Sequence, residues 1–253
     1  AYRPVFPSQL RNTTPVMHAP DHDDLQAHVA THSLAWLLVG NTVGLLMASL
    51  LLWPELGRLF VPLTYGRWAT VHLNVQLYGW CSMPLLGLLF RWYLPRQNCQ
   101  VGVWALQAWT GALLFSAIAW LAGDVSGKPF MEWRGLTRWV FPAAMLSLAL
   151  LLARGYAARL RETPETRWTI RLKAGALLAL SLIPPVMAWA ADPKLYPVIN
   201  PDSGGATGGS LLGSTLGIVV LFLGFPWIAG LPLKRRSRML VVARTRKVEE
   251  VQR

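Results

Sequence analysis

The feature that most constrains this chain is a series of long apolar blocks, each about as long as a lipid bilayer is thick. A transmembrane helix needs about 20 mostly apolar residues, and six segments have that character: 33–54, 69–91, 102–123, 137–154, 173–192 and 209–231. Backbone polar groups at membrane depth must be hydrogen-bonded within the segment, so each block is expected to be helical. The sequence therefore predicts an all-α integral membrane bundle of about six transmembrane helices.

The distribution of charge predicts how the bundle is oriented. Only 14% of the residues are charged, yet the net charge is +12, and the basic residues gather in the loop 155–172 and the tail 232–253. Basic loops beside membrane spans are typical of the cytoplasmic side. Counting back across the spans then predicts that both termini are cytoplasmic. No nucleic-acid recognition motif accompanies the charge, so the expected contact of the basic residues is the lipid bilayer rather than nucleic acid.

Three regions follow from this interpretation. Residues 1–32 are a polar N-terminal cytoplasmic segment, 33–231 are the six-helix transmembrane domain, and 232–253 are a basic cytoplasmic tail. The chain has only two cysteines, so neither a disulfide framework nor a thiolate metal site is expected.

One histidine lies inside a predicted span. Ligand-type side chains within a membrane are costly, which makes His72 a functional candidate. Residues spaced by three and four along a helix share one face, and that face carries His72, Gln76, Gly79, Met83 and Gly87. An imidazole above small residues predicts a slot for a flat macrocycle such as haem. The alternative is a stripe of small residues that packs against a neighbouring membrane helix.

The residues around His72 resemble a known family. The segment GRWATVH at 66–72 is similar to the GRLRPLH stretch that opens the second span of haem-copper oxidase subunit I, in its cbb-type oxidase and nitric oxide reductase branch. WLLVG at 36–40, followed by VGL at 43–45, resembles the first span of those subunits. GKPFMEW at 127–133 is similar to the family's GREYAE stretch in an outer loop.

The resemblance implies roles for three residues. His72 is expected to be an axial ligand of a low-spin b-type haem; Gln76 and Gly79 are candidate haem-binding residues from the helical spacing alone. Arg67 is expected to neutralise a haem propionate, although Ala69 stands where the family has a second arginine. Glu132 is expected to help hold a calcium ion near the propionates. The family also implies a bacterial inner (cytoplasmic) membrane location.

The resemblance covers only the first half of the family subunit. The family's copper-site histidines begin in its sixth span, whereas no histidine follows His72 here. The chain is therefore not expected to be catalytic alone, and other membrane subunits of a multisubunit complex should supply the second haem ligand.

Two functions from different classes remain open. The first is a subunit of a respiratory electron-transfer complex that helps to bind a b-type haem together with a partner chain. The second is a cofactor-free structural subunit of a larger respiratory or photosynthetic assembly. A transporter or membrane enzyme of another family is disfavoured, because the spans hold almost no Asp or Glu.

A pair of histidines near the start of the first span is open to two interpretations. His28 and His32 are four residues apart, a spacing that places two imidazoles on one helix face and suits a metal ion. Acidic residues precede them at 21, 23 and 24, where they favour the start of a helix through its dipole. A solvated helix start is the simpler explanation.

Overall fold

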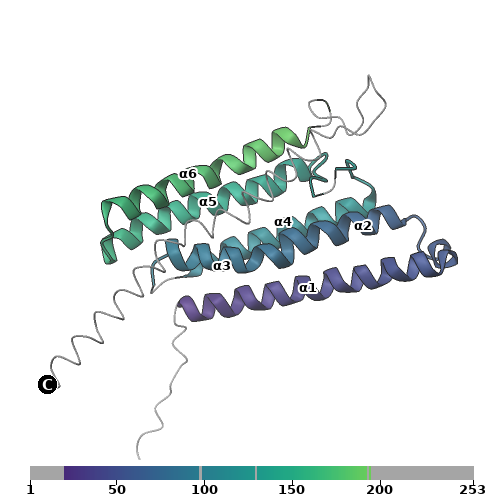
Figure 1. The fold of residues 1–253 in the computed structure, drawn as a ribbon, viewed down its shortest axis with the longest axis horizontal. Coiled ribbons are helices and arrows are strands. Elements are labelled where there is room, and N and C mark those ends of the chain that lie inside the picture. The colour runs from purple at the N-terminus through teal and green to yellow at the C-terminus, as the bar shows by residue number, and fades with distance from the viewer. Residues whose placement is uncertain (1–19, 97–98, 129, 193, 195–253) are drawn as a thin grey trace, which may run out of the picture.

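The computed structural model describes residues 20–96, 99–128, 130–192 and 194, and every regular element within them is helical (Figure 1). In chain order the elements are α1 (His22–Leu52), the short 3₁₀ helix η1 (Pro54–Arg58), α2 (Tyr65–Asn74), the π-helical segment η2 (Val75–Cys81), α3 (Ser82–Tyr93), α4 (Gln100–Ala122), α5 (Thr137–Glu162) and α6 (Arg167–Ala190). The predicted all-α fold is confirmed for this part of the chain.

The helices are those expected of a multi-pass membrane protein. Five spans are long and apolar enough to cross a membrane, with α2, η2 and α3 together forming the second, Tyr65–Tyr93. Consecutive spans run in opposite directions (Figure 1). The starts of α1, α4 and α6 therefore lie at the same end of the bundle as the ends of α3 and α5. We call this the α1-start end, and the other the α2-start end.

The first helix begins with a capping box. The side chain of Asp21 accepts hydrogen bonds from the backbone N–H of Asp23 at 2.8 Å and of Asp24 at 3.0 Å. The carboxylate of Asp24 accepts the backbone N–H of Asp21 in return. These bonds satisfy N–H groups that a helix start leaves unpaired. Helix α1 therefore starts at His22, well before the apolar block at 33.

The second span is continuous but not uniform. Between α2 and α3, residues Val75–Cys81 are wound as a π-helix. The hydroxyl of Ser82 donates to the carbonyl oxygen of Leu77 at 2.6 Å, five residues earlier. Such π segments are rare, and they frequently lie at functional sites. This segment starts three residues after His72.

Aromatic rings hold the second, third and fourth spans together. Trp133 stacks on Phe141 with a centroid distance of 4.4 Å, and Tyr78 meets both rings edge-on. The indole N–H of Trp109 donates to the carbonyl oxygen of Tyr78 at 2.8 Å. The cluster therefore fixes η2 against the start of α5 and the loop before it.

The predicted boundaries need correction at three places. Helix α1 takes up residues 22–32 of the predicted polar segment. Helix α5 continues to Glu162 and α6 begins at Arg167, so most of the predicted loop 155–172 is helical. The hydropathy signal stops where charge begins, but a helix can continue into the interface with its charged side chains in water. The predicted span 209–231 and the tail lie outside the described residues.

Candidate functional site

His72 lies between the second span and α1. Its ring Nδ1 is 2.8 Å from the carbonyl oxygen of Gly40 in α1. A carbonyl oxygen can only accept, so this hydrogen bond places the proton on Nδ1 and leaves the lone pair on Nε2. The ring itself lies over Gly44, where an added Cβ would meet His72 Cε1 at 2.9 Å. Two glycines of α1 therefore seat and orient the imidazole.

An imidazole held in this way is arranged as a metal ligand usually is. Metal-binding histidines commonly donate one ring N–H to a backbone carbonyl or carboxylate, which sets the tautomer and the ring orientation. His72 is half-buried, and its Nε2 makes no hydrogen bond with any described residue. The geometry of His72 therefore fits the ligand role that the resemblance implies.

The rest of the predicted slot is filled by α1. Gln76 lies over Gly40 and donates from Nε2 to Asn41 Oδ1 at 3.0 Å. At Gly79 an added Cβ would lie only 2.7 Å from Trp36 Cγ. The stripe does form one face, but it packs against a neighbouring helix along its length. Gln76 and Gly79 consequently do not line an open slot, and a macrocycle on His72 would have to approach from another side.

Arg67 belongs to α2, and its side chain contacts the end of α4. Its NH1 donates to the carbonyl oxygen of Leu121 at 2.9 Å, and the guanidinium lies against Gly123. Gly123 has φ +103°, a backbone conformation that suits glycine at a helix C-terminus. A cation there also complements the negative end of the helix dipole. Arg67 thus has a structural partner, and only its remaining N–H groups are free for a propionate.

Glu132 is buried in the loop between α4 and α5. One carboxylate oxygen accepts the backbone N–H groups of Ser126 at 2.6 Å and Gly127 at 2.7 Å, and also the Ser126 hydroxyl at 3.1 Å. Those donors compensate the burial of its charge. No group of three or more His, Cys, Asp or Glu side chains that would suit a metal ion occurs among the described residues. Glu132 therefore organises this loop. Among the described residues, the calcium site that the resemblance implies has no cluster of further carboxylates around Glu132.

The histidines of α1 are separated by their contacts. His32 Nδ1 lies 2.8 Å from the hydroxyl of Thr110 in α4. His28 is exposed and lines a surface hollow with Asp24 and Thr31. The pair shares a helix side as its spacing predicts, but the two imidazoles have different surroundings.

Sequence reasoning missed two parts of this site. Gly40 and Gly44 were recognised as part of a motif, but their contact with His72 depends on how two helices pack, and spacing along one helix does not encode that. The π-helical turn after His72 was also missed, because no residue pattern in 75–81 distinguishes it from an α-helix.

Comparisons with known proteins add no identification. The chain matches no protein-family model, no curated protein and no solved structure.

Proposed function

We propose that this chain is a membrane subunit of a respiratory electron-transfer complex and that His72 is an axial ligand of a b-type haem. The observation that carries the proposal is the hydrogen bond from His72 Nδ1 to the carbonyl oxygen of Gly40 at 2.8 Å. This hydrogen bond orients the ring and leaves the lone pair of Nε2 available to a metal, as is common for metal-binding histidines.

The chain's own residues would have distinct tasks in that role. The Gly40 carbonyl accepts a hydrogen bond from Nδ1–H, which increases the basicity of the ring, and Gly44 leaves space for the ring. The haem would supply the electron-carrying iron. Arg67 offers its unused N–H groups to a carboxylate, while its bond to Leu121 fixes the side chain. A second axial ligand would come from another chain.

A structural subunit without a redox cofactor is the second candidate. The observation that favours it is the close packing of α1 over Gln76 and Gly79, where Trp36 fills the place of a slot. In that case His72 would join α1 to the second span through Gly40, as polar side chains often do between membrane helices.

A reduced-minus-oxidised visible spectrum of the detergent-purified complex separates these candidates. We expect His72→Ala to lose a b-type α-band that the parent complex shows. His28→Ala is the matched control, because it removes an exposed histidine from the same bundle, and it should keep the band. Size-exclusion chromatography of each variant establishes that the complex still assembles.

A second variant covers the case in which His72→Ala fails to assemble. Methionine also ligates haem iron and raises the reduction potential relative to histidine. We therefore expect His72→Met to keep the α-band with a higher midpoint potential. An α-band with an unchanged potential in both substitutions, or no haem band in the parent complex, rejects the haem role and leaves the structural one.

A further inference from the structure

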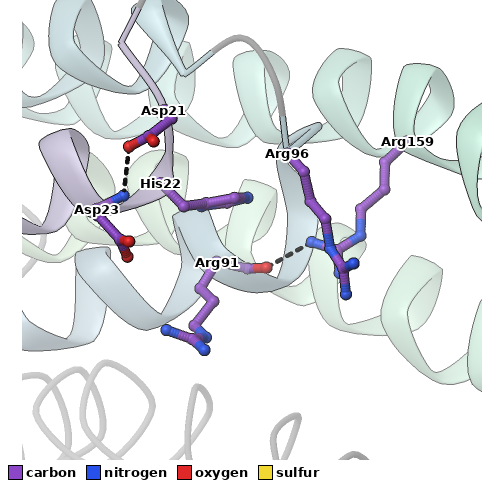
Figure 2. Close-up of a pocket in the computed structure, with 6 residues that line it drawn as sticks. All are labelled: Asp21, His22, Asp23, Arg91, Arg96 and Arg159. Atoms are coloured by element: carbon purple, nitrogen blue, oxygen red, sulfur yellow. Dashed lines mark hydrogen bonds between the residues drawn. The ribbon is translucent and has the colours of Figure 1, made fainter.

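A basic cavity lies at the α1-start end, far from His72. It encloses about 320 Å³ and is lined by His22 at the start of α1, Arg91 at the end of α3, Arg96 in the following loop and Arg159 near the end of α5, together with Asp21 and Asp23. Figure 2 shows the side chains of Arg96 and Arg159 converging, with the ring of His22 directed towards them. The guanidinium of Arg91 is directed away from them, so the basic groups that converge are those of His22, Arg96 and Arg159.

Three arginines line this cavity against two carboxylates, Asp21 and Asp23. None of its three arginines forms an ion pair there, since the two ion pairs of that part of the chain are Arg138–Asp192 and Lys173–Glu165. The Asp21 carboxylate is engaged as the helix cap, and the backbone N–H groups of Asp24 and Asp23 hold its pKa below the usual 3.8. Asp23 is exposed.

The cavity also holds unused hydrogen-bond capacity. The NH1 group of Arg159 donates to the carbonyl oxygens of Arg91 and Leu94, which fixes the side chain across the end of α3. Its Nε is buried and has no hydrogen-bond partner in the described part of the chain. Both ring nitrogens of His22 are also buried and have no hydrogen-bond partner in that part of the chain, although the ring approaches the backbone of Leu94. Buried polar atoms of this kind are rarely left without a partner.

We propose that this cavity binds a phosphate group through Arg96, Arg159 and His22, while Arg91 adds positive charge to the lining. Arginine matches the tetrahedral oxygens of phosphate through paired N–H donors, and such charge-assisted hydrogen bonds are about twice as strong as neutral ones. A phosphate would supply acceptors to the orphaned Nε of Arg159 and to a ring N–H of His22. It would also offset the excess of positive over negative side chains in the lining.

Two sources share this chemistry. The cavity lies at the end of membrane-spanning helices, where the phosphates of anionic lipids gather. A volume of about 320 Å³ is at the small end of ligand cavities, so it suits a headgroup phosphate or free phosphate better than a whole nucleotide.

The test is a titration of the delipidated full-length chain in detergent, followed by native mass spectrometry. The probes are phosphatidylglycerol, phosphatidylcholine and inorganic phosphate. The cavity variant is the double substitution Arg91→Gln and Arg96→Gln, whose side chains make no hydrogen bond with a described residue. The matched control is Arg161→Gln with Arg171→Gln, which removes the same charge from exposed positions at the same end.

We expect the cavity variant to weaken binding of phosphatidylglycerol or of inorganic phosphate by about tenfold or more, as expected for the loss of charge-assisted hydrogen bonds, while the control changes it little. If the cavity substitutions weaken binding of the lipid alone, the cavity is a headgroup site; if they weaken binding of inorganic phosphate, it is a free-phosphate site.

Equal weakening in both variants would show a diffuse basic surface and would overturn the proposal. So would the absence of binding by either anionic probe, or equal affinity for phosphatidylcholine and phosphatidylglycerol in every variant. A thermal melt of each variant verifies that the fold is retained.

Discussion

At the scale of single residues, Lys173 shows how a buried charge is compensated by specific partners. Lys173 in α6 is only 1% exposed, and its Nζ lies 2.6 Å from Glu165 Oε1. The same Nζ donates to the carbonyl oxygen of Trp92 at 3.1 Å, and the hydroxyl of Tyr156 donates to Glu165 Oε2 at 2.9 Å. This network joins the ends of α3 and α5 to the start of α6. It therefore stabilises the turn between the fourth and fifth spans.

Glu165→Gln should destabilise the chain strongly, because it leaves the Lys173 ammonium buried without its counter-charge. Breaking a buried ion pair on one side typically costs about 3–5 kcal/mol. The measurement is the unfolding free energy in mixed detergent, from titration with a denaturing detergent. Glu162→Gln is the control, since Glu162 is exposed at the end of α5 and should change stability by less than about 0.5 kcal/mol.

The double variant Lys173→Met with Glu165→Gln completes this test. It removes both charges, so we expect it to recover much of the stability that Glu165→Gln loses. If the double variant is as unstable as the sum of the two single variants, then the carboxylate and the ammonium do not act as a pair.

The candidate site shows what residue patterns can and cannot predict at this scale. The pattern around His72 identified a histidine whose ring is held with one nitrogen free, because ligand-type residues inside a span are rare. The predicted roles of Arg67 and Glu132 rest on the resemblance alone. Their observed partners, the Leu121 carbonyl and the loop N–H groups at 126 and 127, are set by where a loop folds back, which no spacing in the sequence encodes.

At the scale of elements, close approach of two helices depends on glycine. Helix α1 meets the second span at Gly79, where an added Cβ would lie 2.7 Å from Trp36 Cγ and 2.9 Å from Trp36 Cβ. The Cβ of Trp36 is fixed to its backbone and cannot move aside as a flexible side-chain end can. Membrane helices pack through such small residues because lipid provides no hydrophobic drive between them.

Gly79→Ala should therefore separate α1 from the second span and destabilise the fold by about 1–3 kcal/mol, the usual cost of overpacking. The same detergent unfolding assay measures the change. Gly111→Ala in α4 is the matched control, because nothing lies within 4 Å of an added Cβ there. Alanine favours a helix over glycine by about 1 kcal/mol, so that control should be neutral or stabilising. Similar losses in both variants would mean that Gly79 does not limit the approach of α1.

The positions of the helices could be predicted from the length of the apolar segments. The start of α1 and the π segment could not, because they depend on local hydrogen bonds and packing. The described spans appear where hydropathy places them, since a bilayer admits little except helices. The start of α1 was misplaced because the Asp21–Asp24 capping box lies outside the apolar block. The π segment at 75–81 was missed, because it depends on the packing of η2 and α3 against α1 and α4 rather than on composition.

At the scale of the whole molecule, the orientation of the bundle remains a prediction from the loop charges. The structure places the turn between α5 and α6 at the α1-start end, together with Arg91, Arg96 and Arg159. The loop that follows η1 lies at the α2-start end (Figure 1). If basic residues face the cytoplasm, the α1-start end is inside and the α2-start end is outside.

Cysteine labelling with a membrane-impermeant maleimide tests that orientation. Leu59 is 78% exposed at the α2-start end, and Thr163 is exposed at the α1-start end. In spheroplasts of a bacterial host that expresses the chain, we expect Leu59→Cys to be labelled and Thr163→Cys to be protected, whereas inverted membrane vesicles should give the opposite result. The parent chain measures the background. Cys99 should add little to it, because burial raises the pKa of its thiol to about 11 and the thiolate is the reactive form. Labelling of Thr163→Cys in spheroplasts, with Leu59→Cys protected, would mean that the topology is the reverse of the predicted one. The proposed phosphate cavity would then lie outside. A cavity on that side could not receive a lipid phosphate from the cytoplasmic leaflet, so this experiment also decides which leaflet could supply a lipid to the proposed site.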